Sequence, residues 1–199
     1  MPRAGLTPGR VVEEAAVLAD EAGLDRLTLA LLAQRLGVAL PSLYKHVKGL
    51  DDVRQQLGAL ATAELAAQLA DAAAGRAGLD ALLAVAVAYR SYARRHPGRY
   101  AAAQRAPDPE DPVHVAAGER AVGTIFAALR GYGLDGDDAV DATRGLRSAL
   151  HGFVSLEQAG GFGLPQDVDR SFDSLVRSFD VALRAWPRDR TVETVGPRG

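Results

Sequence analysis

Apolar residues recur along this chain at the three- and four-residue spacing of amphipathic α-helices. In the first such stretch, one helix face carries Val11, Ala15, Leu18 and Ala19. Thr7 is a suitable N-cap ahead of Pro8, and Gly23 can supply the left-handed residue that ends the helix. No segment shows a convincing alternation of apolar and polar residues, as a half-buried strand would. The pattern therefore predicts an all-α fold.

Glycines, prolines and capping residues divide the chain into about nine predicted helices. Their approximate ranges are 8–22, 28–37, 41–47, 51–74, 79–95, 100–104, 113–132, 137–159 and 166–186. The three short helices fall within residues 1–50, where we expect an N-terminal three-helix domain. The longer helices predict a larger helical-bundle domain over residues 51–187. Residues 188–199 are polar, and we expect a disordered tail there.

Composition limits the class of protein. The 199 residues are 48% hydrophobic, which is enough for a well-buried core. The absence of cysteine excludes a disulfide framework, a thiolate metal site and a thiol nucleophile, and it suits a reducing cytoplasm. No uncharged apolar run of about 18 residues and no signal-peptide core occur, so we expect a cytoplasmic protein without a membrane partner. A net charge of −2 leaves room for a local basic patch.

The most informative stretch is residues 29–47, LALLAQRLGVALPSLYKHV. Two short helices joined by a four-residue turn cross steeply, which requires a small residue at the crossing and a residue that tolerates positive φ in the turn. Ala33 and Gly37 meet these conditions, and Leu43 is placed as the buried anchor of the second helix. The spacing predicts a helix-turn-helix. An ordinary helical hairpin is the alternative.

In a helix-turn-helix the second helix enters the major groove of DNA. On the predicted helix, Tyr44 and His46 lie off the buried face and can bind phosphates, while Ser42 and Lys45 can reach base edges. The alternative for Tyr44 and His46 is packing against the fourth helix. Thr28 begins the preceding helix, where a phosphate suits the helix dipole. The predicted DNA contacts are Thr28, Leu40, Pro41, Ser42, Tyr44, Lys45, His46 and Lys48.

The run LTLALLAQRLGVALPSLYKHVKGLDDV resembles the DNA-binding signature of the TetR/AcrR family of transcriptional regulators. The match covers residues 8–55 closely. The resemblance implies a homodimer whose two short helices enter successive major grooves of a pseudo-palindromic operator in double-stranded DNA. It also implies a repressor that a small-molecule effector releases, with the fourth helix connecting the effector pocket to the DNA-binding helices. One departure is Ala30, where family members often carry a basic residue.

The segment LRSALHGFVSL, residues 146–156, is similar to the penultimate helix of one branch of this family. The resemblance implies that the last two long helices pair with those of a second subunit. The last helix has two apolar strips, of which one can face its own domain and the other a partner. A helix fully buried in its own subunit is the alternative. The predicted interface residues are Leu146, Leu150, Phe153, Phe172, Leu175, Phe179 and Leu183.

Aromatic side chains are scarce, and several fall in the middle helices. We expect a pocket there for an apolar or amphipathic effector, with tyrosine hydroxyls and histidines to orient it. The predicted ligand contacts are Tyr89, Tyr92, Tyr100, His114, Phe126 and His151. The alternative is that they are ordinary core residues.

An enzyme and a protein that binds ligands or partners but not DNA are the two alternatives to a DNA-binding regulator. For an enzyme, no GxSxG, phosphate-binding glycine loop or HExxH is present; Glu110, Asp111 and His114 have a metal-like spacing that a charged helix start explains better. Asp135, Asp137 and Asp138 vaguely resemble a calcium loop, but capping explains them better. We therefore expect no enzyme, metal or cofactor. A helical ligand-binding or interaction protein that no longer reads DNA is the second alternative, in keeping with Ala30 and the low net charge.

Overall fold

The computed structural model describes residues 6–187, and in this range it contains nine α-helices, one 3₁₀ turn (Leu24–Arg26) and no strand. The helices are α1 (Pro8–Ala22), α2 (Leu29–Leu36), α3 (Leu40–Leu43), α4 (Leu50–Ala73), α5 (Gly78–Arg95), α6 (Pro97–Ala102), α7 (Pro112–Arg130), α8 (Gly136–Gln158) and α9 (Val168–Arg184). The all-α prediction and the number of helices are confirmed. The predicted disordered tail, residues 188–199, lies outside the described residues.

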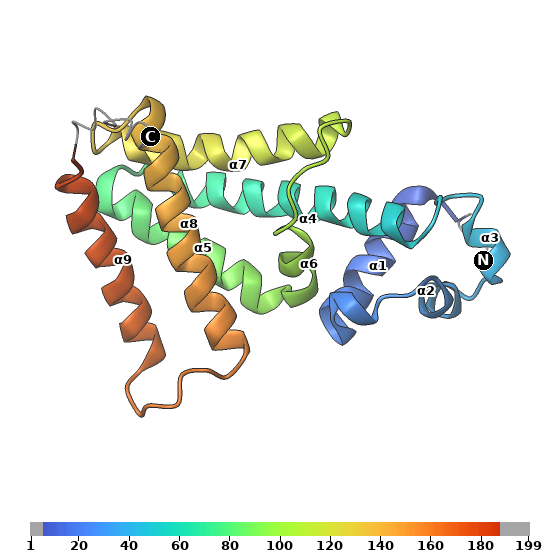
Figure 1. The fold of residues 1–199 in the computed structure, drawn as a ribbon. Helices are drawn as coiled ribbons and strands as arrows, with labels where there is room; N and C mark the ends of the chain where they lie inside the picture. Colours follow the sequence, from blue (N-terminus) through green and yellow to red (C-terminus); the bar gives the residue numbers. More distant parts are fainter. Residues whose placement is uncertain (1–5, 188–199) are drawn as a thin grey trace, which may run out of the picture.

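Helix α4 runs through the length of the molecule (Figure 1). Helices α1, α2 and α3 lie around one of its ends, while α8 and α9 lie side by side near the other. Between these ends, α5, α6 and α7 pack along α4. No helix among residues 6–187 is both long enough and apolar enough to cross a membrane.

Two hydrophobic cores form. The N-terminal core joins α1, α2 and α3, and it includes Val53 and Leu57 from the first two turns of α4 and Ala102 from α6. The larger core joins α5, α7, α8 and α9 to the remainder of α4. Because α4 contributes to both cores, a movement of α4 necessarily changes packing in both. The predicted boundary at residue 50 therefore falls at the start of a helix that contributes to both cores.

Helix α6 packs unusually closely on α1. A β-carbon at Gly98 would lie 2.1 Å from the carbonyl carbon of Ala19, so only glycine fits there. Next to this contact, the Asp20 carboxylate accepts the backbone N–H of Arg99 at 2.9 Å and lies 3.2 Å from Nδ1 of His96. These interactions join the corner between α5 and α6 to the end of α1.

The far end of the molecule is organised around a buried arginine. Arg90 of α5 donates to the Glu157 carboxylate of α8, and its Nη2 lies 2.7 Å from Asp169 of α9. The same guanidinium stacks over the rings of Phe153 and Phe172. This single side chain therefore connects three helices. Hydrogen bonding to Arg90 holds the pKa of Glu157 below its ordinary value.

Candidate functional site

Helices α2 and α3 have the geometry that the spacing predicts. Gly37 has φ of +66° and ends α2 in the left-handed conformation, and the N–H of Val38 returns to the carbonyl of Ala33 at 3.0 Å. Ala33 is buried where the two helices approach, and Leu43 is fully buried beneath α3. The helix-turn-helix is thus present as a packed unit.

Helix α3 is shorter than the predicted 41–47. It spans Leu40–Leu43, and hydrogen-bonded turns continue it, with the N–H groups of His46 and Val47 both donating to the carbonyl of Leu43. The physical reason is the entry into α4. Val47 is buried in the core, and the backbone N–H of Lys48 donates to the Asp52 carboxylate of α4 at 2.7 Å. The chain must therefore leave the helical path soon after Leu43.

Most of the predicted DNA contacts lie on the surface. Tyr44 is 57% exposed, so it does not pack against α4 as the alternative interpretation required. The Thr28 hydroxyl caps α2 by accepting the N–H of Leu31 at 3.2 Å. Exposed residues are Thr28, Leu40, Pro41, Tyr44, Lys45 and Lys48, and half-buried ones are Ser42 and His46. The geometry makes these side chains available, and their contacts with DNA stay a prediction.

An ion-pair cluster holds α2 against α1. Nε of Arg35 lies 2.9 Å from Glu14, and its Nη1 donates to Glu21. Hydrogen bonding to Arg35 lowers the pKa of the Glu21 carboxyl. Arg35 and Glu21 are exposed and Glu14 is half-buried, so the cluster mainly positions α2, while the buried core stabilises the domain.

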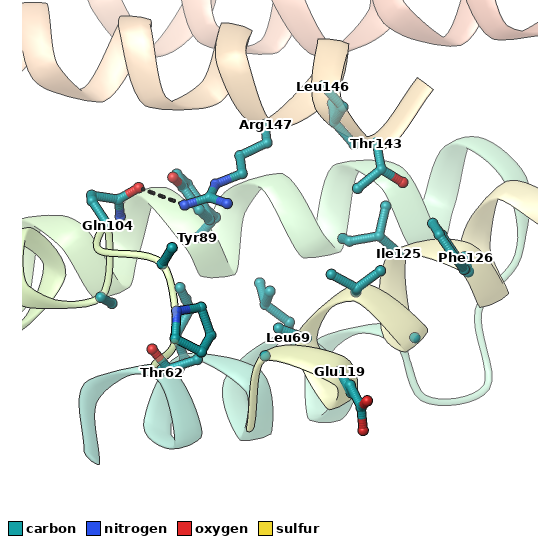
Figure 2. Close-up of a pocket in the computed structure, with 18 of the residues that line it drawn as sticks. Thr62, Leu69, Tyr89, Gln104, Glu119, Ile125, Phe126, Thr143, Leu146 and Arg147 are labelled. Carbon is teal, nitrogen blue, oxygen red and sulfur yellow. Dashed lines mark hydrogen bonds between the residues drawn. The ribbon is translucent and has the colours of Figure 1, made fainter. Parts of the chain in front are cut away.

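A cavity of about 670 Å³ lies between α4, α5, α7 and α8. Its walls are mostly apolar, with Leu69 of α4, Ile125 and Phe126 of α7, and Leu146 of α8 facing it (Figure 2). This volume is in the range of small-molecule sites, which are typically about 300–1,000 Å³. The segment 103–107, which directly follows α6, closes one side.

A few polar groups line this cavity. The Thr143 hydroxyl is buried without a hydrogen-bond partner among the described residues. Arg147 donates to the side chain of Gln104 at 3.3 Å across the opening (Figure 2). The Tyr89 ring also lines the cavity, and burial raises the pKa of its hydroxyl, so the phenol stays neutral. An apolar cavity with a few polar groups suits an apolar or amphipathic molecule.

Of the predicted ligand contacts, Tyr89 and Phe126 line this cavity, and their contact with a ligand stays a prediction. Tyr92 does not line this cavity, because it is fully buried and its hydroxyl donates to the carbonyl of Ala61. Tyr100 and His151 lie behind Tyr89. The Tyr100 hydroxyl is 2.9 Å from that of Tyr89 and 2.6 Å from Nδ1 of His151.

His114, the remaining predicted ligand contact, lines a separate smaller cavity instead. The prediction chose these residues for their aromatic surface and polar groups, but large aromatic side chains are also often buried in the core. It missed the small residues of α7 that leave the space. These are Gly118, Ala121 and Gly123, and their run of small side chains was the available signal.

The predicted dimer interface needs revision. Leu146, Leu150, Phe172 and Leu183 are all buried within the core of their own subunit, so they present no surface to a partner. Their periodicity reflected packing of α8 and α9 on α5. The remaining predicted residues, Phe153, Leu175 and Phe179, are half-buried.

Of the acidic groups that the sequence explains as caps, Asp111 caps a helix through its side chain, while Asp135 stands at the N-cap of α8 without a side-chain capping hydrogen bond. Asp111 accepts the backbone N–H groups of Val113 and His114 at the start of α7. Asp138 accepts the indole N–H of Trp186 at 3.2 Å. Among residues 6–187, no group of three or more histidine and acidic side chains is arranged to hold a metal ion.

Comparison with known proteins agrees with this architecture. Residues 82–179 match the family model described as "Tetracyclin repressor-like, C-terminal domain". The chain is 44% identical over 189 residues to the uncharacterized HTH-type transcriptional regulator Rv0681 of Mycobacterium tuberculosis, covering 94% of this chain and 84% of that protein. It is 35% identical to the uncharacterized HTH-type transcriptional regulator YobS of Bacillus subtilis, covering 89% and 93%.

A solved structure shows the same fold. A TetR variant from Acinetobacter baumannii AYE, in complex with minocycline, superposes with a TM-score of 0.69 at 24% identity, covering 91% of this chain and 98% of that one. The fold and the α2–α3 unit therefore define a helix-turn-helix transcriptional regulator. The chain belongs to the TetR family, a class of regulators and not a family of enzymes.

Proposed function

We propose that this regulator is a homodimeric repressor that binds a pseudo-palindromic operator through α3 and is released by an apolar or amphipathic effector. The observation that carries the proposal is the exposed polar surface of α3 and of the turns that follow it in a packed helix-turn-helix. Tyr44, Lys45 and Lys48 are exposed there, while Leu43 and Val47 fix the helix from beneath. A helix exposed in this way fits the major groove, where contacts with phosphates fix its position and side chains reach the base edges.

The effector site is the 670 Å³ cavity. Its apolar walls favour an apolar molecule, and the hydroxyl of Thr143, which has no partner among residues 6–187, offers a hydrogen bond to it. The related TetR structure that was solved with minocycline supports a small-molecule effector for a chain of this fold. We divide the chain accordingly into a DNA-binding part, residues 1–50, and an effector-binding and dimerisation part, residues 51–187.

The cavity has two routes to the DNA-binding part. Leu65 and Leu69 of its wall belong to α4, whose first turns pack in the N-terminal core. The segment 103–107 continues from α6, which Gly98 holds against α1. An effector that separates the cavity walls therefore moves the N-terminal helices. The two helix-turn-helix units of a dimer bind successive major grooves only when they lie about 34–36 Å apart. A small change in their separation therefore lowers the affinity for DNA.

The outward faces of α8 and α9 are the proposed dimer interface. Ser148, Gly152 and Leu156 follow one another at four-residue spacing on α8, away from the buried side of the helix. A β-carbon at Gly152 would meet no atom within 4 Å in its own subunit, which leaves room for a close helix. Val181 adds an exposed apolar side chain on α9. Burial of these groups against a second copy completes a four-helix arrangement.

The test is binding of the purified protein to fluorescent fragments of the DNA upstream of its own gene. The proposal expects a specific complex that weakens steeply with salt, and its release by members of a metabolite and antibiotic library that also raise the melting temperature. A folded dimer that binds no fragment specifically at low salt, yet is stabilised by ligands, would instead support the ligand-binding protein that no longer reads DNA.

A further inference from the structure

A second cavity, of about 200 Å³, lies between the start of α4, the segment between α6 and α7, and the start of α7. It is polar where the larger cavity is apolar, and the two share Arg105 and Ala106 as lining residues. The residues that line it are Asp51, Arg54, Gln55, Gly58, Arg105, Ala106, Asp108 and His114.

Two nitrogen atoms at this cavity are buried without a partner among the described residues. His114 is only 3% exposed, and its Nδ1 has no hydrogen-bond partner. Its other ring nitrogen, Nε2, lies 3.2 Å from the hydroxyl of Thr62, a residue that lines the larger cavity. In the tautomer in which the Thr62 hydroxyl donates to Nε2, the proton of the imidazole is on Nδ1, which is then an unused donor. Nε of Arg54 is likewise buried and unpartnered.

The buried polar groups of the cavity that lack a partner favour an anion. Neither Arg54 nor Arg105 has a carboxylate within 4 Å in the described part of the chain. Of the two acidic residues, Asp108 already accepts the side-chain N–H of Gln55 at 3.1 Å and a backbone N–H at 2.9 Å. Asp51 is exposed in the first turn of α4. The buried groups that lack a partner are therefore nitrogen atoms, Nε of Arg54 and Nδ1 of His114, and Arg105 adds an exposed guanidinium. Buried donors require an acceptor, whereas the carboxylate of Asp51 is exposed to water.

We propose that this polar cavity binds an anionic oxygen group, such as a carboxylate, carried by the effector whose apolar part occupies the larger cavity. The inference rests on the proposed effector site and names the class of effector: an amphipathic organic acid. The shared Arg105 and Ala106 make the two cavities neighbours, so one molecule can reach both. Arg54, Arg105 and Nδ1 of His114 are the donors.

The position of Arg54 gives this group a direct effect on the DNA-binding part. Arg54 lies in the second turn of α4, and Asp52 in the preceding turn binds the backbone N–H of Lys48. An anion held between Arg54 and the donors of α7 and the preceding segment therefore acts on the end of α4 that carries the helix-turn-helix. An alcohol or amide with the same apolar part lacks this attachment.

The test uses isothermal titration of the full chain with matched pairs: decanoate against 1-decanol, and 2-naphthoate against 2-naphthamide. We expect at least one acid to bind about tenfold or more tightly than its neutral counterpart. In Arg54→Gln this preference disappears while binding of the neutral compound is unchanged. Arg120→Gln, an exposed position on α7 that lines neither cavity, keeps the preference. Circular dichroism and urea unfolding establish that each variant is folded.

The outcomes separate this inference from the proposed effector site. Equal affinity for acid and neutral compound, or a preference that survives Arg54→Gln, overturns the anion site and leaves the apolar cavity standing. If none of the four compounds binds, and no member of the wider library releases the protein from its operator, the effector site itself is contradicted. Acetate and inorganic phosphate are titrated as anions without an apolar part. An Arg54-dependent affinity for them equal to that for decanoate overturns the joint binding mode and assigns the cavity to a free anion.

Discussion

The α-carbon of Gly98 lies directly against the backbone of Ala19, and a β-carbon there would come within 2.1 Å of that residue's carbonyl group. This contact is between backbone and backbone, so no side-chain rotation can relieve it. It joins α6, which leads into the wall of the larger cavity, to α1, which packs in the same core as the helix-turn-helix. Glycine at this position therefore sets how closely the two parts of the molecule pack.

We predict that Gly98→Ala destabilises the protein by about 1–3 kcal/mol or more, because the added methyl group forces α6 away from α1. The affinity for DNA also falls, because the helix-turn-helix changes its position relative to the rest of the molecule. Urea unfolding and DNA titration measure the two effects. Gly123→Ala is the control: it lies in α7, an added β-carbon meets no atom within 4 Å, and helix propensity favours alanine by about 0.5–1 kcal/mol. Unchanged stability of Gly98→Ala would contradict the close contact.

Arg90 provides the second prediction. Its side chain is 9% exposed and pairs with Glu157 of α8, which is 18% exposed. Arg90→Met keeps the length but leaves the Glu157 carboxylate half-buried without its main partner, which is expected to cost about 3 kcal/mol in the free energy of unfolding at neutral pH. Arg94→Met, on the same helix with 58% exposure, is expected to change stability by less than about 0.5 kcal/mol.

This pair also predicts a pH dependence. The folded state lowers the pKa of Glu157 below the ordinary 4.5, with the Arg90 hydrogen bond as the main cause. The stabilisation is therefore complete above pH 4.5 and is lost as the pH falls through the lowered pKa. Arg90→Met should lose stability less steeply between pH 5 and pH 3 than the unchanged protein, at the same protein concentration. Parallel curves for the two proteins would show that the ion pair does not carry this acid sensitivity.

The sequence predicts the DNA-binding part better than the effector site, and the reason is physical. Gly37, Ala33 and Leu43 lie within eleven residues of one another, so their spacing alone defines how two helices cross. A cavity has no such local signal. It forms where small residues of α7 face Leu69 and Leu146 from distant helices, which depends on how four helices pack. Hydrophobic periodicity locates the buried side of a helix but does not say what covers it.

The same limit explains the dimer prediction. Periodicity correctly marked Phe172 and Leu183 as buried, but they face their own subunit. The available face is the opposite one, where small and isolated apolar residues give a weak pattern. Gly98 was missed for a related reason. A glycine that follows a proline predicts a turn, and only the position of α1 shows that a β-carbon does not fit there.

Val181 tests the revised interface. It is 65% exposed on α9, and Val113 is 67% exposed on α7, outside that face. We predict that Val181→Arg converts the dimer to a monomer at micromolar concentration, because it places a charge in the apolar interface, while Val113→Arg leaves the mass unchanged. Light scattering after size-exclusion chromatography measures the mass. A dimer that tolerates arginine at position 181 would place the interface elsewhere.

Lys48 tests the DNA-binding surface. Its side chain is exposed at the end of the turn after α3, while its backbone N–H is held by Asp52. If Lys48 of each subunit neutralises one phosphate, Lys48→Ala reduces the magnitude of the slope of log affinity against log salt concentration. The expected reduction is about one unit per subunit, or about two for the dimer. Fluorescence anisotropy over several salt concentrations gives the slope. Arg76→Ala, at the opposite end of α4, should leave the slope unchanged, and a slope unaltered by Lys48→Ala would remove this residue from the phosphate contacts.

Filling the larger cavity should separate effector response from DNA binding. Ala121 of α7 lines the cavity, whereas Ala127 on the same helix is exposed and lies outside it. Tryptophan at position 121 occupies space that an apolar ligand would use, so Ala121→Trp should lower ligand affinity at least tenfold while the operator complex still forms. Ala127→Trp adds the same side chain without entering the cavity, and its response should match that of the unchanged protein. Thermal shift and anisotropy with the same ligand measure both. Full ligand release of DNA from Ala121→Trp would mean that the effector binds at some other site, because a side chain of this size leaves too little of the cavity for a second apolar molecule.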